Sequence, residues 1–150
     1  MKDSATSAIA RGPSANSPKK EAVMLKHGIL NPQINSLLSR VRHTNTLVIA
    51  DRGFPFWSDI ETVDISLVDD IPTVLNVLQA VAANFTIGRA WMAAEFKDAA
   101  SASSLNAYSL LLPTMQFESH SEFKRRVPFA IGLIRTADTT PYANVILESA

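Results

Sequence analysis

The strongest constraint on the fold is an apolar stripe at helical spacing between residues 71 and 85. Its members recur three and four residues apart, which places them on one face of a helix: Ile71, Val74, Leu75, Leu78, Val81, Ala82 and Phe85. We expect Asp69 and Asp70 to cap this helix, with Pro72 in its first turn. Because a helix with one apolar face needs a second layer to cover it, the stripe indicates a layered domain.

Short apolar segments typical of β-strands lie on both sides of this stripe. The segment 62–67 has period two, as in a half-buried strand. Other strands are predicted at 47–50, 86–95, 115–118, 129–136 and 143–147, and further helices from Asn31 and at 99–112 and 119–127. Strands separated by helices favour parallel pairing. We therefore expect an α/β fold over residues 26–150, a single layered domain with a largely parallel central sheet flanked by helices.

Residues 1–22 differ in composition from the rest of the chain. They are rich in Ser, Ala, Pro and Lys and show no apolar periodicity, so we expect a disordered N-terminal extension. The stretch lacks the apolar region of a secretory signal. A cytoplasmic location is therefore the default expectation.

The composition of the chain argues against several classes of function. Its 14 acidic and 14 basic residues cancel, which argues against a nucleic-acid partner. The chain has no cysteine, and His27, His43 and His120 are too far apart for a local metal-binding motif. No apolar run has the length of a membrane span. We predict no metal, no nucleic acid and no membrane contact.

A phenol and a carboxamide stand two residues apart near the C-terminus, directly after Pro141. Strand side chains alternate between faces, so Tyr142 and Asn144 would share one face at the start of the last strand. Two hydrogen-bonding side chains in this place suit a small polyhydroxylated ligand. The alternative is an edge strand whose polar side chains face water.

A second pair of polar residues flanks the strand predicted at 47–50. Asn31 and Pro32 begin a helix that ends near His43, where the helix dipole favours a cationic side chain. Asp51 follows the strand, and ligands bind at the carboxyl ends of strands in α/β sheets. Alternatively, His43 is a C-capping residue and Asp51 belongs to an ordinary loop.

A third polar segment opens the helix predicted at 119–127. Ser119 and Glu122 form the pattern of a capping box, which explains both by structure alone. His120 and Lys124 are four residues apart and share one helix face, which by itself indicates a solvated helix.

Taken together, these segments resemble the D-ribose pyranase family, which is related to the L-fucose mutarotases. The resemblance runs from about Lys26 to the C-terminus in unchanged order. It rests on His43-Thr44-x-Thr46, Ala50-Asp51-x-Gly53-x-Pro55, Ser119-His120-x-x-Phe123-Lys124, Ile134-Arg135-Thr136 and Thr140-Pro141-Tyr142-Ala143-Asn144.

The resemblance implies that the chain interconverts the pyranose and furanose forms of ribose, a monosaccharide, without cofactor or metal. It also implies a homo-oligomer of two stacked five-membered rings, a decamer, with sites at subunit contacts. It places His120 and Lys124 at the sugar site with Asp51, Tyr142 and Asn144.

The chain departs from the family pattern at several positions, and the departures at Arg42, Arg52, Phe54 and Trp57 lie next to the proposed site. The family usually carries small or apolar residues in place of Arg42 and Arg52, and Gly-Glu in place of Ala137-Asp138. The loop with Phe54, Phe56 and Trp57 is also bulkier. These changes affect the identity of the sugar more than the chemistry. The aromatic loop suggests an oligomer contact, because aromatic residues are enriched in interface cores.

Interconversion of sugar ring forms requires proton transfers alone, since a base deprotonates the anomeric hydroxyl while an acid protonates the ring oxygen. A histidine is suited to this work, and we select His43 as the acid/base. Asp51, His120, Lys124, Tyr142 and Asn144 are then the substrate-binding residues.

Three alternatives remain open at this stage. Arg42 and Arg52 would suit an anionic sugar, which gives a mutarotase for another substrate. The same polar set would also suit a sugar-binding accessory protein without turnover. A nucleotide-binding α/β domain ranks lower, because the five glycines form no phosphate-binding loop.

Overall fold

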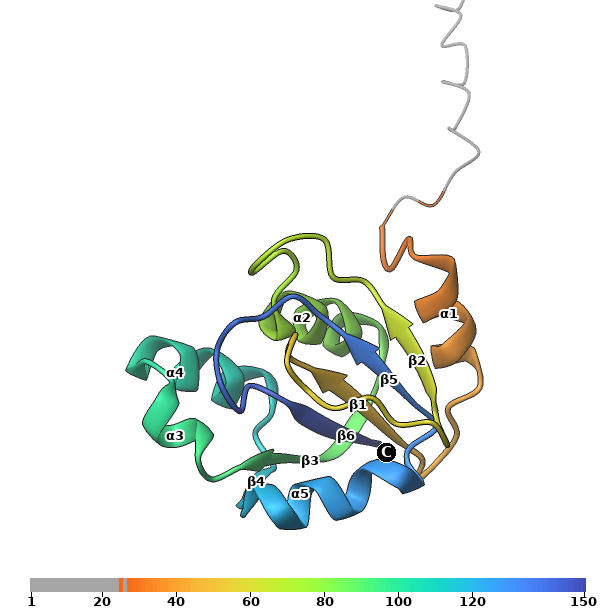
Figure 1. The fold of residues 1–150 in the computed structure, drawn as a ribbon. Helices are drawn as coiled ribbons and strands as arrows, with labels where there is room; N and C mark the ends of the chain where they lie inside the picture. The colour runs from red at the N-terminus through yellow and green to blue at the C-terminus, as the bar shows by residue number, and fades with distance from the viewer. Residues whose placement is uncertain (1–24, 26) are drawn as a thin grey trace, which may run out of the picture.

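A computed structural model describes residue 25 and residues 27–150 (Figure 1). The predicted disordered extension, residues 1–22, lies outside the described residues. The helices are α1 (Pro32–Ser39), α2 (Val74–Asn84), α3 (Phe96–Ala99), α4 (Ala102–Leu111) and α5 (His120–Arg126), with a 3-10 turn η1 (Val127–Phe129). The strands are β1 (Thr46–Ala50), β2 (Glu61–Asp64), β3 (Ile87–Ala93), β4 (Met115–Glu118), β5 (Gly132–Arg135) and β6 (Val145–Ser149).

The strands form one six-stranded sheet in the order β2-β5-β1-β6-β3-β4. Only β6 runs antiparallel to its neighbours in this sheet, and it pairs with both β1 and β3. The other neighbouring strands pair in parallel. The predicted α/β class, a single domain with a largely parallel sheet flanked by helices, is confirmed.

The two faces of the sheet carry separate apolar clusters, as the alternation of side chains along a strand requires. Leu47 and Ile49 of β1 point into the larger cluster, which α1, α2 and α4 cover. Val48 and Ala50 point the other way, toward Phe123 of α5. Figure 1 shows α5 on the opposite side of the sheet from α2. The first residue after β1, Asp51, therefore emerges between two fixed layers.

Capping side chains mark the first residues of α1 and α5. The Asn31 side chain accepts a hydrogen bond from the amide of Ile34 at 2.9 Å, and Pro32 occupies the first turn of α1, as predicted. Ser119 caps α5 in the same way by accepting from the amide of Glu122 at 3.2 Å. The side chain of Glu122 pairs with Arg125. His120 is therefore the first residue of a capped helix.

The predicted start of the central helix was wrong. α2 begins at Val74 with Thr73 as its cap. The Thr73 hydroxyl accepts from the amide of Asn76, and the Asn76 carboxamide oxygen accepts from the amide of Thr73. Asp70 instead adopts a left-handed backbone with φ 63°. Ile71 forms a bridge with Val68 and leaves 55% of its surface exposed. An apolar residue at helical spacing was thus counted into the stripe although it lies in a turn.

The remaining boundaries shift where the chain offers better caps or turns. The helix predicted at 99–112 is α4 at Ala102–Leu111, because Ser101 caps it, and the short helix α3 lies before it, where no helix was predicted. The strand predicted at 129–136 begins at Gly132, after the 3-10 turn η1. The last strand, predicted at 143–147, is β6 at Val145–Ser149. That last difference changes the argument about Tyr142 and Asn144.

Candidate functional site

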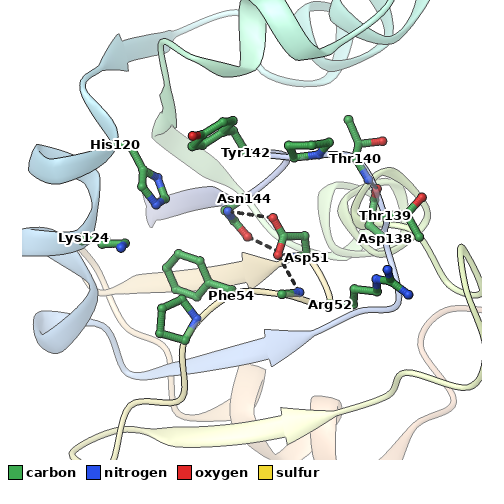
Figure 2. A pocket seen from close by; sticks show the side chains of 13 residues that line it. Asp51, Arg52, Phe54, His120, Lys124, Asp138, Thr139, Thr140, Tyr142 and Asn144 are labelled. Atoms are coloured by element: carbon green, nitrogen blue, oxygen red, sulfur yellow. Dashed lines mark hydrogen bonds between the residues drawn. The ribbon is translucent and has the colours of Figure 1, made fainter.

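A cavity of about 370 Å³ opens at the carboxyl end of β1, beside the loop that leads into β6 (Figure 2). Five of the six site residues expected from the sequence line it, namely Asp51, His120, Lys124, Tyr142 and Asn144. They come from three segments that are far apart in sequence. The rest of the wall is Arg52, Gly53, Phe54, Pro55, Asp138, Thr139, Thr140 and Pro141.

Asp51 and Asn144 form a paired unit on one side of the cavity. The Asn144 carboxamide accepts from the Asp51 amide at 2.7 Å and donates to the Asp51 carboxylate at 3.2 Å. Gly53 donates its amide to the other carboxylate oxygen at 2.9 Å. Asn144 is 2% exposed, so these bonds fix its orientation. Figure 2 shows the two side chains facing each other.

Partial burial governs the charge state of Asp51. Burial raises the pKa of the Asp51 carboxyl above its ordinary value, and this outweighs the hydrogen bonds from Gly53, Asn144 and Phe54, which lower it. Each carboxylate oxygen already accepts one protein donor, but an oxygen has room for a second. Asp51 can therefore accept hydrogen bonds from sugar hydroxyls.

His120 is held by its backbone and by aromatic rings. Its amide donates to both carboxylate oxygens of Glu95, at 3.1 and 3.2 Å. Its ring stacks with Phe123 at a centroid distance of 6.2 Å and meets the edge of Tyr142 at 5.0 Å. The imidazole therefore has little freedom to turn.

The surroundings of His120 favour the neutral ring. Burial lowers the pKa of the His120 imidazole, and the nearby charge of Lys124 lowers it further. Its Nδ1 atom is buried and has no hydrogen-bond partner among the described residues. Because an imidazolium needs acceptors for two N–H groups, His120 suits a neutral hydrogen-bonding role. Lys124, one turn further along α5, is half-buried and lines the same cavity.

Tyr142 lies in the cavity wall because of a loop conformation, and the sequence had predicted a strand there. Residues 142 and 144 precede β6, and Tyr142 adopts a left-handed backbone with φ 60°. The period-two argument was therefore wrong, although both side chains line one cavity. The loop that brings them there is closed by a bond from the amide of Ala143 to the carbonyl of Thr140.

His43 lies at the other end of β1. It is exposed in a turn before the strand, four residues after α1 ends at Ser39 and thus beyond the reach of the helix dipole. Since the five residues of β1 alone span about 17 Å, His43 does not reach the cavity of its own chain. Figure 1 shows β1 within the sheet, between β5 and β6.

The two arginines near the expected site differ in position. Arg52 lines the cavity mouth, and its guanidinium forms an ion pair with Asp69. Arg42 lies at the His43 end, where its guanidinium donates to the carbonyls of Ser39 and Val41. Only Arg52 is therefore placed to meet a ligand in this cavity.

The three aromatic side chains of the loop after Asp51 lie in different environments. Phe54 is buried as part of the cavity wall, and Trp57 packs against the same apolar cluster. Phe56 leaves 75% of its surface exposed. Two of the three rings therefore cover the chain's own core, and Phe56 is the one left for the oligomer contact expected of this loop, which stays a prediction.

Sequence reasoning did not place the strap 138–140 in the site. The Asp138 carboxylate accepts from the amides of Val74 and Thr140, at 2.9 and 2.8 Å, and its side chain is buried. Thr139 donates its amide to Asp70 at 2.8 Å. The one signal in the sequence was the run of short polar residues before Pro141, which marks a loop but not its partner.

The described residues contain no group of three or more His, Cys, Asp or Glu side chains placed to hold a metal ion. Within the same part of the chain, no helix is both long enough and apolar enough to cross a membrane.

The fold and the cavity define a class of protein: a small α/β protein with a polar pocket of monosaccharide size at the end of a central strand. Residues 24–150 match the model of the RbsD / FucU transport protein family. The chain belongs to that family, and its class is that of the sugar isomerases.

Individual relatives support this assignment. The chain is 38% identical over 127 residues to a D-ribose pyranase of Bacillus cereus, covering 84% of this chain and 97% of the relative. It is 41% identical over 131 residues to the D-ribose pyranase of Geobacillus kaustophilus, covering 84% and 93%.

Solved structures agree with the sequence relatives. Bacillus subtilis RbsD complexed with D-ribose superposes with a TM-score of 0.79 at 32% identity, covering 85% of this chain and 98% of that one. The fucose mutarotase of Streptococcus pneumoniae, in complex with L-fucose, shares the fold with a TM-score of 0.71 at 18% identity, covering 84% and 98%.

Proposed function

We propose that this chain interconverts the pyranose and furanose forms of D-ribose by acid/base ring opening without a cofactor. The observation that carries the proposal is the convergence of Asp51, His120 and Asn144, with Lys124 and Tyr142, on one cavity. The curated relatives at 38% and 41% identity are D-ribose pyranases, which supports ribose as the sugar.

The polar groups of the cavity suit the binding of a reducing sugar. The Asp51 carboxylate accepts from sugar hydroxyls, and the neutral His120 ring and the Tyr142 phenol donate or accept. The ammonium group of Lys124 adds a cation close to His120, where it stabilises negative charge that develops on an oxygen as the ring opens. We assign these residues to binding and polarisation.

We propose His43 as the acid/base, supplied by a second copy of the chain. A histidine suits proton transfer near neutral pH. His43 and the cavity of the same chain lie at opposite ends of β1. His43 can therefore act only on a sugar in the cavity of a neighbouring subunit, with the turn that carries His43 packed over that cavity. Such a head-to-tail contact generates a ring when its rotation closes. We propose five-membered rings stacked as a decamer.

The surface beside the cavity mouth favours such a contact. The turn that carries Asp69 and Asp70 also exposes three large apolar side chains, Leu67, Val68 and Ile71, and Leu67 leaves 75% of its surface free. Asp69 pairs with Arg52 at the mouth, and Asp70 accepts from Thr139 of the strap. Apolar residues gathered in this way mark a protein contact.

A cytoplasmic location stays a prediction from the sequence.

Two alternatives predict different results. An anionic sugar would draw on Arg52, whose guanidinium forms an exposed ion pair with Asp69. A sugar-binding accessory protein would hold ribose without speeding its exchange.

Saturation-transfer NMR on ribose at equilibrium tests the proposal, because it reads exchange between ring forms directly. We expect faster pyranose–furanose exchange of ribose with the protein present, and a weaker effect on ribose 5-phosphate, whose phosphorylated O5 cannot close a pyranose ring and whose exchange is read between its furanose anomers. Binding without faster exchange would favour the accessory role, and a preference for the phosphorylated sugar would favour the anionic substrate.

A further inference from the structure

The segment 52–55 builds one wall of the cavity with little support from its own backbone. Its amides make only two backbone bonds among the described residues, from Arg52 to the carbonyl of Asp138 at 3.1 Å and from Phe54 to that of Asp51 at 3.4 Å. The Phe54 ring holds a defined place, with its centroid 6.3 Å from that of the His120 ring in an edge arrangement. The amide of Gly53 bonds to the Asp51 carboxylate and Pro55 has no amide, so the carbonyls of this segment are the groups left for another donor to fix.

Arg135 supplies that support from outside the cavity. It is the last residue of β5, paired with Ala50 of β1, and its side chain is only 13% exposed. Its guanidinium donates to three carbonyls of the loop: to Phe54 at 2.6 Å, to Arg52 at 3.3 Å and to Pro55 at 3.3 Å. Arg135 itself does not line the cavity.

The shape of the guanidinium makes this arrangement specific. A planar group with five N–H donors reaches several carbonyls at once, whereas an ammonium group is a single point of charge. The nearest carboxylate oxygen, on Asp64, lies 3.9 Å from Nε, so the loop carbonyls are the closer partners. Hydrogen bonds from a charged donor are stronger than those between neutral groups.

We infer that Arg135 is a positioning residue for the sugar site. By fixing the carbonyls of the loop, it sets the place of Phe54 against His120. It also holds Gly53, whose amide orients the Asp51 carboxylate. The effect of Arg135 on sugar binding rests on the proposed function, whereas its effect on the order of the loop does not.

Hydrogen exchange tests the structural part without any sugar. Arg135→Lys keeps the charge and removes the planar fork, and Arg40→Lys is the matched control, because Arg40 forms a surface ion pair with Glu61. We expect amide exchange in residues 52–57 to rise about tenfold in Arg135→Lys, as for the loss of one charge-assisted hydrogen bond. β1 and β5 should stay protected, and Arg40→Lys should match the wild type.

Kinetics test the link to the site. In Arg135→Lys we expect the KM for ribose exchange to rise about tenfold, with a smaller change in kcat, because a loop out of place weakens binding before it alters proton transfer. In Arg135→Ala, millimolar guanidinium should restore part of the lost affinity, and the same salt should leave Arg40→Ala unchanged. Melting temperatures verify that each variant folds.

The outcomes separate the two claims. Unchanged exchange in residues 52–57 of Arg135→Lys would overturn the clamp, whatever the activity. A looser loop with an unchanged KM would overturn the positioning role. If the wild type showed no ribose exchange, the proposed function would fail, while the hydrogen-exchange result would still decide whether Arg135 orders the loop.

Discussion

The two ends of β1 differ in what they offer a sugar. At the carboxyl end, Asp51 and Asn144 are locked together beside His120, inside a cavity whose walls come from three segments. At the amino end, His43 stands exposed in a turn. The proposed binding residue Asp51 and the proposed acid/base His43, which are eight residues apart in the sequence, are thus separated by the whole strand. The difference teaches that a complete site would have to combine two copies of the chain.

Removing the imidazole at the amino end should have the largest effect. We expect His43→Ala to reduce ribose exchange by roughly two to four orders of magnitude, the usual worth of a general acid/base. Ribose binding should persist, since the carboxyl end is intact. Saturation-transfer NMR gives the rate and calorimetry the affinity, with the exposed His27→Ala as control. Full activity in His43→Ala would contradict the assignment of His43, at the amino end of β1, as the acid/base.

Disrupting the carboxyl end should affect stability as well as binding. Asn144→Ala leaves the amide of Asp51 without its acceptor in a partly buried site. We expect this to lower the free energy of unfolding by about 1–3 kcal/mol, the cost of an unsatisfied buried donor. Urea unfolding measures it against Asn106→Ala on the exposed face of α4. Equal stability of the two variants would contradict the assigned role of the pair.

A smaller, pH-dependent effect should appear at Asp51. The fold raises the pKa of its carboxyl through burial, so the folded state binds the proton more tightly than the unfolded state, and the charged form opposes folding above that pKa. Asp51→Asn removes this charge together with one acceptor, so its stability relative to the wild type should be greatest at pH 7. That relative stability should fall as the pH drops through the raised pKa toward 3.8.

Melting curves between pH 7 and 4 measure this trend, with the exposed Asp59→Asn as reference. A relative stability of Asp51→Asn that rose on acidification would reverse the assigned direction. In either case, Asp51→Asn should bind ribose more weakly, because an amide in place of the carboxylate gives up one acceptor.

Local patterns predicted much of the fold and part of the site. Helix starts could be predicted at Asn31, Pro32 and Ser119, because these residue types cap helices or fit their first turn. Asp51 could be predicted as a cavity residue because it follows an apolar strand. The start of α2 was missed because the turn at Asp70 depends on Thr139, a partner 69 residues away. Spacing along a chain carries no information on such a contact.

The site illustrates the same limit. Tyr142 lines the cavity for a different reason from the one predicted, since a left-handed residue rather than strand alternation brings it there. The strap at Asp138 and the support from Arg135 depend on contacts with distant backbone groups. The separation of His43 from Asp51 appears only when the direction of β1 is known.

Mixed oligomers test the central claim most directly. His43→Ala subunits, expected to lack proton transfer, and Asp51→Asn subunits, expected to bind ribose weakly, are coexpressed with different tags. Doubly tagged particles are purified, and exchange is measured at low ribose concentration, where each parent is close to inactive. In a head-to-tail contact, one face of each subunit meets the other face of its neighbour, so random mixing leaves roughly a quarter of the sites with both native residues. We predict that ribose exchange returns to about that fraction of the wild-type rate. Mixed particles as inactive as their parents, or a wild-type monomer with full activity, would contradict a site shared between copies.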